Sequence, residues 1–164
     1  MRTVFVASVL GAILVTIGRA GGAEVKAAPD VSLQTEQGAP ARLAAFKGKV
    51  ILVDFWASWC APCKTSFPAL EALHREFAPR GLAVLAVNLD ERRKDADGFL
   101  SAHPHTMPVL FDPNGGAPAA FGVKGMPSSF LIDRAGIIRF THMGYTANIG
   151  QQYRQEIDLL ISEH

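Results

Sequence analysis

The sequence predicts an α/β domain with a mixed central β-sheet flanked by helices, and three observations carry this prediction. Residues 50–55 (VILVDF) and 81–90 (GLAVLAVNLD) are apolar runs without strict alternation, as expected for strands buried on both faces. Between them, residues 61–78 place apolar side chains at helical spacing. Residues 128–133 and 136–143 flank a short RAG turn, which is typical of an antiparallel hairpin. Strands, intervening helices and a hairpin together predict one sheet covered on both sides.

The N-terminal 23 residues differ in composition from the remainder of the 164-residue chain. Arg2 is followed by an uncharged apolar stretch from Val4 to Ile17 and then by small residues, which is the layout of an export signal. This stretch is shorter than the roughly 20 residues that span a bilayer comfortably. Residues 1–23 are therefore a signal peptide removed after Ala23, or an uncleaved anchor that tethers the protein to a membrane through residues 3–18.

The chain after residue 23 divides into a linker and one domain. Residues 24–30 are small and polar and are predicted to be the linker, and residues 31–164 are long enough to form one domain with a substantial core. The domain is predicted to begin with a hairpin, whose short strands lie near residues 31–35 and 41–43 around the turn QGAP.

The remaining predicted elements follow from turn signals and helical spacing. A helix over residues 95–102 and a strand over 108–112 are predicted between the second buried strand and the final hairpin, and a short helix is predicted over 117–123. Asn148 is predicted to cap a last helix with one apolar stripe. That stripe consists of Ile149, Tyr153, Ile157 and Leu160.

Charge is evenly distributed along the chain. The formal net charge is +1, and no block of like charge indicates a nucleic-acid partner. In the helix over residues 61–78, Glu71 and Arg75 are four residues apart and predict an ion pair on the surface. We expect a monomer that binds no nucleic acid.

Cys60 and Cys63 are the only cysteines of the chain, and their role has three candidate explanations. A structural staple gains little, because the entropy that a disulfide removes from the unfolded chain grows with loop length and this loop is short. A structural zinc site needs four ligands, and the only histidine cluster, residues 103–105, reads as a polar loop around Pro104. We therefore expect no metal and favour chemistry.

The chemical explanation rests on the position of the pair at the start of a helix. Cys60 lies where a buried strand leads into the predicted helix, and unpaired amide groups at a helix N-terminus stabilise a thiolate and lower its pKa. Cys63 lies one turn further along the same side, within bonding reach and more deeply buried. Pro62 falls in the first turn, where its missing N–H costs nothing. An exposed attacking thiol and a buried resolving thiol make a thiol–disulfide exchanger.

Asp54 interrupts the buried strand six residues before Cys60. A carboxyl group in that position is costly unless it is hydrogen-bonded, protonated or functional, and burial should raise its pKa. Two interpretations remain: Asp54 takes the proton of Cys63 during exchange, or it belongs to a polar network in the core.

Two segments resemble thioredoxins. Residues 53–64, VDFWASWCAPCK, are very similar to the thioredoxin active-site segment, and residues 125–133, GMPSSFLID, resemble the segment around the cis-proline of that fold. The resemblance implies that the Met126–Pro127 bond is cis and that the backbone of Met126 binds a partner's extended chain as an added strand. Substrate contacts are expected from four residues, Trp59, Pro62, Met126 and Pro127.

The wider pattern resembles the TlpA/ResA-like thioredoxin-fold disulfide reductases of bacteria. The export signal, the lead-in hairpin and the additional helix and strand between AVNLD and FGVKGMP carry this resemblance, which covers the chain from Val31 onward. It implies a thioredoxin fold with a redox-active Cys60–Cys63 disulfide and no bound cofactor. It further implies a periplasmic or membrane-tethered reductase of exported proteins, often serving cytochrome c maturation and reduced by a membrane electron donor.

The chain departs from the relatives at two positions. Some of them carry a glutamate three residues after the second cysteine, where this chain has Ser66. Thioredoxins commonly place a lysine near the end of the next strand, whereas LAVNLD has none. Asp54 is therefore the remaining candidate for the proton acceptor, and its pKa is less constrained than the resemblance implies.

Three other functions compete with a disulfide reductase. A disulfide oxidase or isomerase would use the same residues at a less reducing potential. A thiol peroxidase is a further enzymatic alternative, and a tethered thioredoxin-like module with an idle dithiol is the non-enzymatic one.

Overall fold

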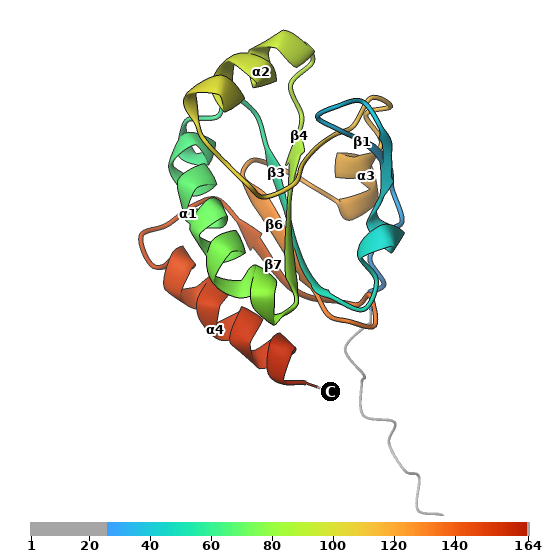
Figure 1. Ribbon diagram of the computed structural model, residues 1–164, viewed down its shortest axis with the longest axis vertical. Coiled ribbons are helices and arrows are strands. Elements are labelled where there is room, and N and C mark those ends of the chain that lie inside the picture. Colours follow the sequence, from blue (N-terminus) through green and yellow to red (C-terminus); the bar gives the residue numbers. More distant parts are fainter. Residues whose placement is uncertain (1–25, 164) are drawn as a thin grey trace, which may run out of the picture.

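The structure is a computed structural model that describes residues 26–163, so the predicted signal or anchor over residues 1–23 lies outside the described residues. One seven-stranded sheet forms the centre of the described part, with helices on both of its faces (Figure 1). None of the helices over residues 26–163 is long and apolar enough to cross a membrane.

The observed elements match the predicted ones closely. The strands are β1 (Ser32–Thr35), β2 (Pro40–Arg42), β3 (Val50–Trp56), β4 (Leu82–Asn88), β5 (Val109–Phe111), β6 (Ser128–Ile132) and β7 (Ile138–Met143). The α-helices are α1 (Ala61–Phe77), α2 (Arg93–Ala102), α3 (Ala117–Phe121) and α4 (Ile149–Ser162). Two 3₁₀-helices that the sequence did not predict, η1 (Leu43–Phe46) and η2 (Ala78–Arg80), follow β2 and α1.

The sheet is mixed, as predicted, with strand order β2-β1-β5-β4-β3-β6-β7. Strands β3, β4 and β5 run parallel to one another. Strand β6 pairs antiparallel with β3, and β7 pairs antiparallel with β6. The N-terminal hairpin pairs antiparallel with β5, so the predicted helix–strand insertion joins the hairpin to the parallel core. The carboxyl ends of the three parallel strands therefore meet at one edge of the sheet.

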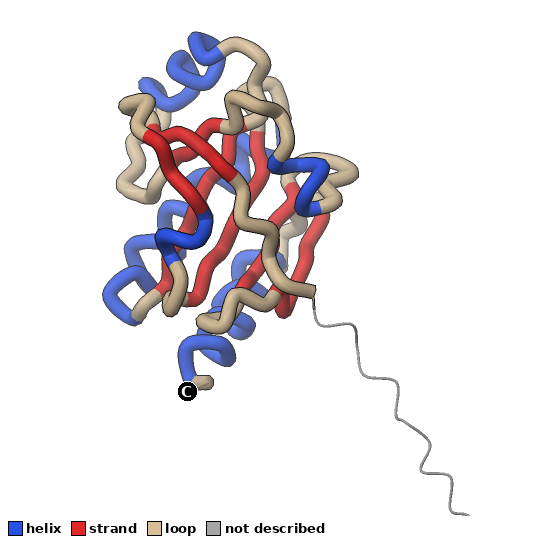
Figure 2. Tube along the Cα trace, turned by 90° about the vertical axis from the view of Figure 1, so that its right-hand side faces the viewer, coloured by secondary structure: helices blue, strands red, loops and turns tan. Residues whose placement is uncertain are grey.

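Two apolar layers cover β3, which explains its continuous apolar run. Leu52 and Trp56 pack with residues of α1 and α4 on one face, and Val53 and Phe55 pack with α3 on the other. Figure 2 shows the strands with the two long helices behind them and the hairpin and short helices in front. Since side chains alternate along a strand, Asp54 points to the same face as Leu52 and Trp56.

The apolar stripes of the two long helices are buried as predicted. In α1 the stripe consists of Phe67, Leu70, Leu73 and Phe77, and in α4 of Ile149, Tyr153, Ile157 and Leu160. Asn148 does occupy the position before α4, but its side chain makes no capping hydrogen bond, so that part of the prediction is wrong. Its backbone has φ −93° and ψ −7°, close to helical values, instead of the extended conformation from which a capping side chain usually reaches the first turn.

The predicted surface position of the Glu71–Arg75 ion pair is also wrong, because Glu71 is buried. Its pair with Arg75 is present at 2.6 Å, but the carboxylate also accepts hydrogen bonds from Thr106 N, Thr106 Oγ1 and Met107 N. Burial alone would raise the pKa of Glu71, yet these bonds outweigh it and lower the pKa to about 2. Glu71 thereby fixes the loop between α2 and β5 against α1.

The described part of the predicted linker is bonded to the domain. Ala27 forms an antiparallel bridge with Ile137, and Ala28 N donates to Gly136 O at 2.8 Å. Asp30 accepts from Ala44 N and forms an ion pair with Arg42. The packed unit therefore starts before residue 31.

Candidate redox site at the start of α1

Cys60 occupies the N-cap of α1, as the sequence predicted. Its backbone is extended, with φ −80° and ψ 105°, and Pro62 lies in the first turn. The Cys60 sulfur accepts a hydrogen bond from Cys63 N at 3.3 Å. A backbone N–H and the positive end of the helix dipole therefore face Sγ of Cys60, which is the arrangement that stabilises a thiolate.

Cys60 and Cys63 form a disulfide, with their Cα atoms 5.2 Å apart. Cys60 is 5% exposed and Cys63 is fully buried. The predicted order of burial is confirmed, whereas the exposed Cys60 of the sequence prediction is largely covered in this disulfide form. Of the two cysteines, only Cys60 retains exposed surface.

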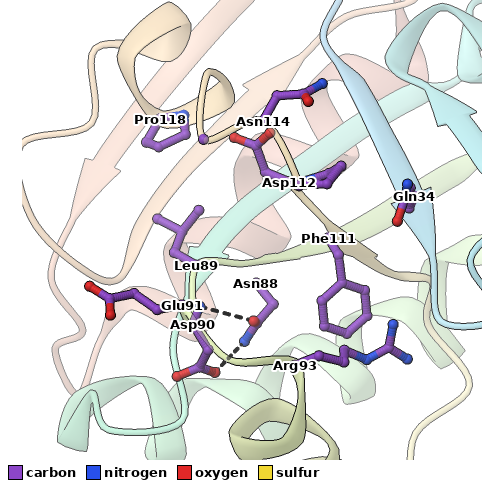
Figure 3. A pocket seen from close by; sticks show the side chains of 12 residues that line it. Gln34, Asn88, Leu89, Asp90, Glu91, Arg93, Phe111, Asp112, Asn114 and Pro118 are labelled. Carbon is purple, nitrogen blue, oxygen red and sulfur yellow. Dashed lines mark hydrogen bonds between the residues drawn. The ribbon is translucent and has the colours of Figure 1, made fainter.

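A carboxylate that the sequence analysis did not single out holds the loop before Cys60. Asp90 accepts from Ser58 N at 3.0 Å and from Ser58 Oγ at 2.8 Å. Asn88 Nδ2 also donates to Asp90, at 2.7 Å (Figure 3). These bonds link the end of β4 to the segment between β3 and α1. Trp59 projects from this fixed loop with 68% of its surface exposed, as a partner-binding side chain requires.

A cavity of about 640 Å³ lies at the same edge of the sheet, between the ends of β4 and β5 (Figure 3). Asp90 and Asp112 line it, but both are already engaged, Asp90 with Ser58 and Asp112 with Ala117 N at the start of α3. Arg93 also lines it and lies over the Phe111 ring, 3.9 Å from the centroid. The cavity is thus bounded by side chains that hold neighbouring loops.

The Met126–Pro127 peptide bond is cis, as the resemblance implied. Strand β6 starts at the next residue, Ser128, opposite Phe55 near the end of β3. Pro127 therefore lies at the sheet edge from which the chain continues to Cys60. Gly144 N donates to Pro127 O at 2.8 Å and ties this turn to the end of β7.

Asp54 is 1% exposed and lies at the centre of the sheet. Ser129 Oγ donates to Asp54 Oδ1 at 2.5 Å and is itself 2.7 Å from the hydroxyl of Tyr153. Oδ2 has no hydrogen-bond partner among residues 26–163. Burial raises the pKa of Asp54 to about 7, and the hydrogen bond from Ser129 opposes part of that rise.

Ser66, which stands where some relatives have a glutamate, is hydrogen-bonded to the backbone of α1. Ser66 is buried, and its hydroxyl donates to the carbonyl oxygen of Cys63 at 3.1 Å. A neutral hydroxyl committed to the backbone cannot take a proton from a thiol.

Within residues 26–163, no three side chains of His, Cys, Asp or Glu are grouped so that they could hold a metal ion.

The sequence model of the AhpC/TSA family matches residues 25–141. The chain belongs to this family. It is 36% identical over 139 residues to the thioredoxin-like protein YneN of Bacillus subtilis, covering 83% of this chain and 79% of that protein. It is 31% identical over 145 residues to the thiol-disulfide oxidoreductase ResA of Geobacillus thermodenitrificans, covering 85% and 83% of the two chains.

A solved structure with a similar backbone supports the same assignment. The thiol:disulfide interchange protein DsbE of Chlorobium tepidum superposes with a TM-score of 0.81 at 40% identity, covering 84% of this chain and 97% of that one. The predicted thioredoxin fold and the TlpA/ResA-like relationship are confirmed. This AhpC/TSA family member is a thiol-disulfide oxidoreductase, and that assignment replaces the binding-module alternative.

Proposed function

We propose that this oxidoreductase reduces disulfides of exported proteins through Cys60 and Cys63, with Asp54 as the proton acceptor. The observation that carries the proposal is the asymmetry of the pair. Cys60 is at the helix N-cap with its sulfur accepting the backbone N–H of Cys63, and Cys63 is fully buried on the face to which Asp54 points.

The first step is attack on the substrate. The Cys60 thiolate forms a bond to one sulfur of the substrate disulfide, whose S–S bond breaks and whose other sulfur leaves as a thiolate that takes a proton from water. Trp59 and the turn at Met126–Pro127 border the site on which an extended substrate chain would lie. Pro62 keeps the first turn of α1 rigid beneath it.

The second step closes the Cys60–Cys63 disulfide. The Cys63 thiol gives its proton to the carboxylate of Asp54, and the resulting thiolate attacks Cys60 Sγ. The bond between Cys60 and the substrate breaks, and the second substrate sulfur leaves as a thiolate. Two electrons have then moved from the dithiol to the substrate disulfide, and an external dithiol must reduce Cys60–Cys63 before the next cycle.

The cellular setting is part of the proposal. The apolar segment in residues 1–23 supports export, either into the periplasm or to its membrane surface, where disulfides persist. The resemblance to TlpA/ResA-like reductases supports cytochrome c maturation as the pathway, with apocytochrome disulfides as the clients and a membrane dithiol carrier as the electron donor. We expect the protein to work as a monomer with no bound cofactor.

The direction of electron flow separates a reductase from an oxidase or isomerase. We expect a standard potential within ~40 mV of the thioredoxin value of about −270 mV, because the Ala-Pro dipeptide and the buried acid are similar. Equilibration with glutathione buffers, followed by separation of oxidised and reduced protein, measures it. A value near −120 mV would make the protein an oxidant.

A further inference from the structure

A hydrogen-bonded chain of three side chains crosses from the sheet to α4 on the face of the sheet where Cys63 packs. Ser129 lies directly opposite Asp54 in the register of β3 and β6, and Tyr153 reaches them from the buried stripe of α4. The oxygen–oxygen distances are 2.5 Å between Ser129 and Asp54 and 2.7 Å between Ser129 and Tyr153. All three residues are at most 3% exposed, so water does not compete with these bonds.

The chain has one direction when Asp54 is ionised. A serine hydroxyl has a single hydrogen and an ionised carboxylate only accepts, so Ser129 donates to Asp54 and Tyr153 must donate to Ser129. Burial, together with the nearby Asp54 charge, raises the pKa of Tyr153, which therefore keeps its proton and stays a donor at neutral pH. Donors thus point from α4 toward Oδ1 of Asp54.

The other carboxylate oxygen is left for proton uptake. Asp54 Oδ2 is buried and has no hydrogen-bond partner in the described part of the chain, although such atoms are rarely left without one. It belongs to a side chain on the face where Cys63 packs against Trp56 and the apolar residues of α1. A proton can bind to Oδ2 without either hydroxyl turning, because Oδ1 remains the acceptor in both protonation states.

We propose that Ser129 and Tyr153 are positioning residues whose hydroxyl chain orients Asp54 so that Oδ2 receives the proton of Cys63. In that step the S–H bond of Cys63 breaks, its electron pair stays on sulfur, and an O–H bond forms on Oδ2. This inference rests on the proposed role of Asp54. The two hydroxyls also supply stabilisation of the carboxylate in a chain that lacks a lysine at the end of β4.

Uncharged side chains flank Asp54 on both neighbouring strands. Neutral Ala86 lies opposite it on β4, Ser129 faces it from β6, and the nearest titratable group on α4 is Tyr153. On α1, Cys63 and Cys60 belong to the apolar cluster on the same face of the sheet, and they titrate only in the reduced protein. Beyond the tyrosine ring, His142 packs at 5.0 Å between ring centroids and pairs with Glu156 at 2.7 Å.

Removing the hydroxyls one at a time tests the inference. Ser129→Ala deletes the donor to the ionised form and should raise the pKa of Asp54 by about one pH unit; Tyr153→Phe should raise it by less. Carbon-13 NMR of the Asp54 carboxyl carbon in the oxidised protein measures this directly. The pH profile of the resolving step should move upward by the same amount, while KM for the substrate stays unchanged.

Ser128→Ala is the matched control. Its hydroxyl donates to Gly125 O, and its register with Phe55 places it on the opposite face of the sheet, so the pKa of Asp54 should not move. Ser129→Thr retains a hydroxyl and should restore most of the shift caused by Ser129→Ala. A pKa of Asp54 that is unchanged in both Ser129→Ala and Tyr153→Phe would overturn the inference.

The two proposals fail in different ways. If Asp54→Asn leaves the rate of the resolving step unchanged, Asp54 is not the proton acceptor. The positioning role of Ser129 and Tyr153 is then wrong as well, even if NMR shows that their removal changes the pKa of Asp54. If Asp54→Asn slows that step but the hydroxyl deletions move neither the pKa nor the pH profile, the reductase mechanism stands and the positioning role is wrong.

Discussion

Replacing Cys63 with serine is expected to abolish turnover and to leave the protein covalently attached to its substrates. Cys63→Ser removes the resolving thiolate but preserves the helix N-cap that activates Cys60, where the backbone N–H of residue 63 still faces the Cys60 sulfur. The mixed disulfide formed by Cys60 should therefore persist. Expression of a tagged, exported Cys63→Ser protein should give higher-mass species on non-reducing gels. These species should disappear when dithiothreitol reduces their disulfide bonds.

The matched control is the double variant Cys60→Ser, Cys63→Ser, which should give no such species. Trapped apocytochromes or their chaperones would support the cytochrome c setting, and other exported proteins would support a broader client range. If Cys63→Ser traps nothing under conditions in which the wild-type protein is active, exchange through a protein mixed disulfide is the wrong mechanism.

Replacing Asp54 with asparagine is expected to slow catalysis and to stabilise the fold. The rate of the resolving step should fall by about 10²-fold at pH 7, the lower end of the usual contribution of a general base. The difference in rate between Asp54→Asn and the wild type should become smaller above pH 8.5, which is near the ordinary pKa of a cysteine. At that pH Cys63 loses its proton without the help of Asp54. Stopped-flow measurement of tryptophan fluorescence during reduction of a model disulfide follows these rates, and unchanged rates across neutral pH would make Asp54 only a polar core residue.

The stability effect follows from the raised pKa of Asp54. The unfolded chain releases this proton near pH 3.8, whereas the folded protein keeps it until about pH 7. Ionisation of the unfolded state therefore lowers the free energy of unfolding as the pH rises from 3.8 to 7, by on the order of 4 kcal/mol. Asparagine avoids this cost but leaves an amide group unpaired, at about 1–3 kcal/mol.

Asp54→Asn should consequently be more stable than the wild type by about 1–3 kcal/mol at pH 8 and no more stable at pH 4. Urea unfolding of the oxidised proteins at both pH values measures the difference without cysteine titration. Asp158→Asn is the control, since that carboxylate is exposed and pairs with Arg80 on the surface. Equal stability differences at pH 4 and pH 8 would show that Asp54 does not titrate as described.

Most of the fold could be predicted because local signals and burial agree. The run over residues 50–55 is apolar on both alternating faces, and the structure covers both faces of β3. The only polar residue of that run, Asp54, was conspicuous for the same reason. The redox role of Cys60 and Cys63 could be predicted because the pair lies at the positive end of the helix that follows this strand.

The partners of these residues could not be predicted, because they come from distant parts of the chain. Ser129 looks like one of two ordinary serines in a strand, and only the register with β3 shows which one faces Asp54. Tyr153 read as an apolar member of a helical stripe, although its hydroxyl completes the chain. The same holds for Glu71, whose local pair with Arg75 concealed its bonds to residues 35 and 36 positions away.

The division of labour between Cys60 and Cys63 is tested most directly by limited alkylation of the reduced protein at pH 7, with mass spectrometry of the peptides over time. Cys60 should be labelled well before Cys63, because its sulfur accepts the backbone N–H of residue 63 at the helix N-cap and because Cys60 is the one of the two residues with exposed surface. Equal labelling of the two cysteines, or labelling of Cys63 first, would contradict the assignment of Cys60 as the attacking thiol.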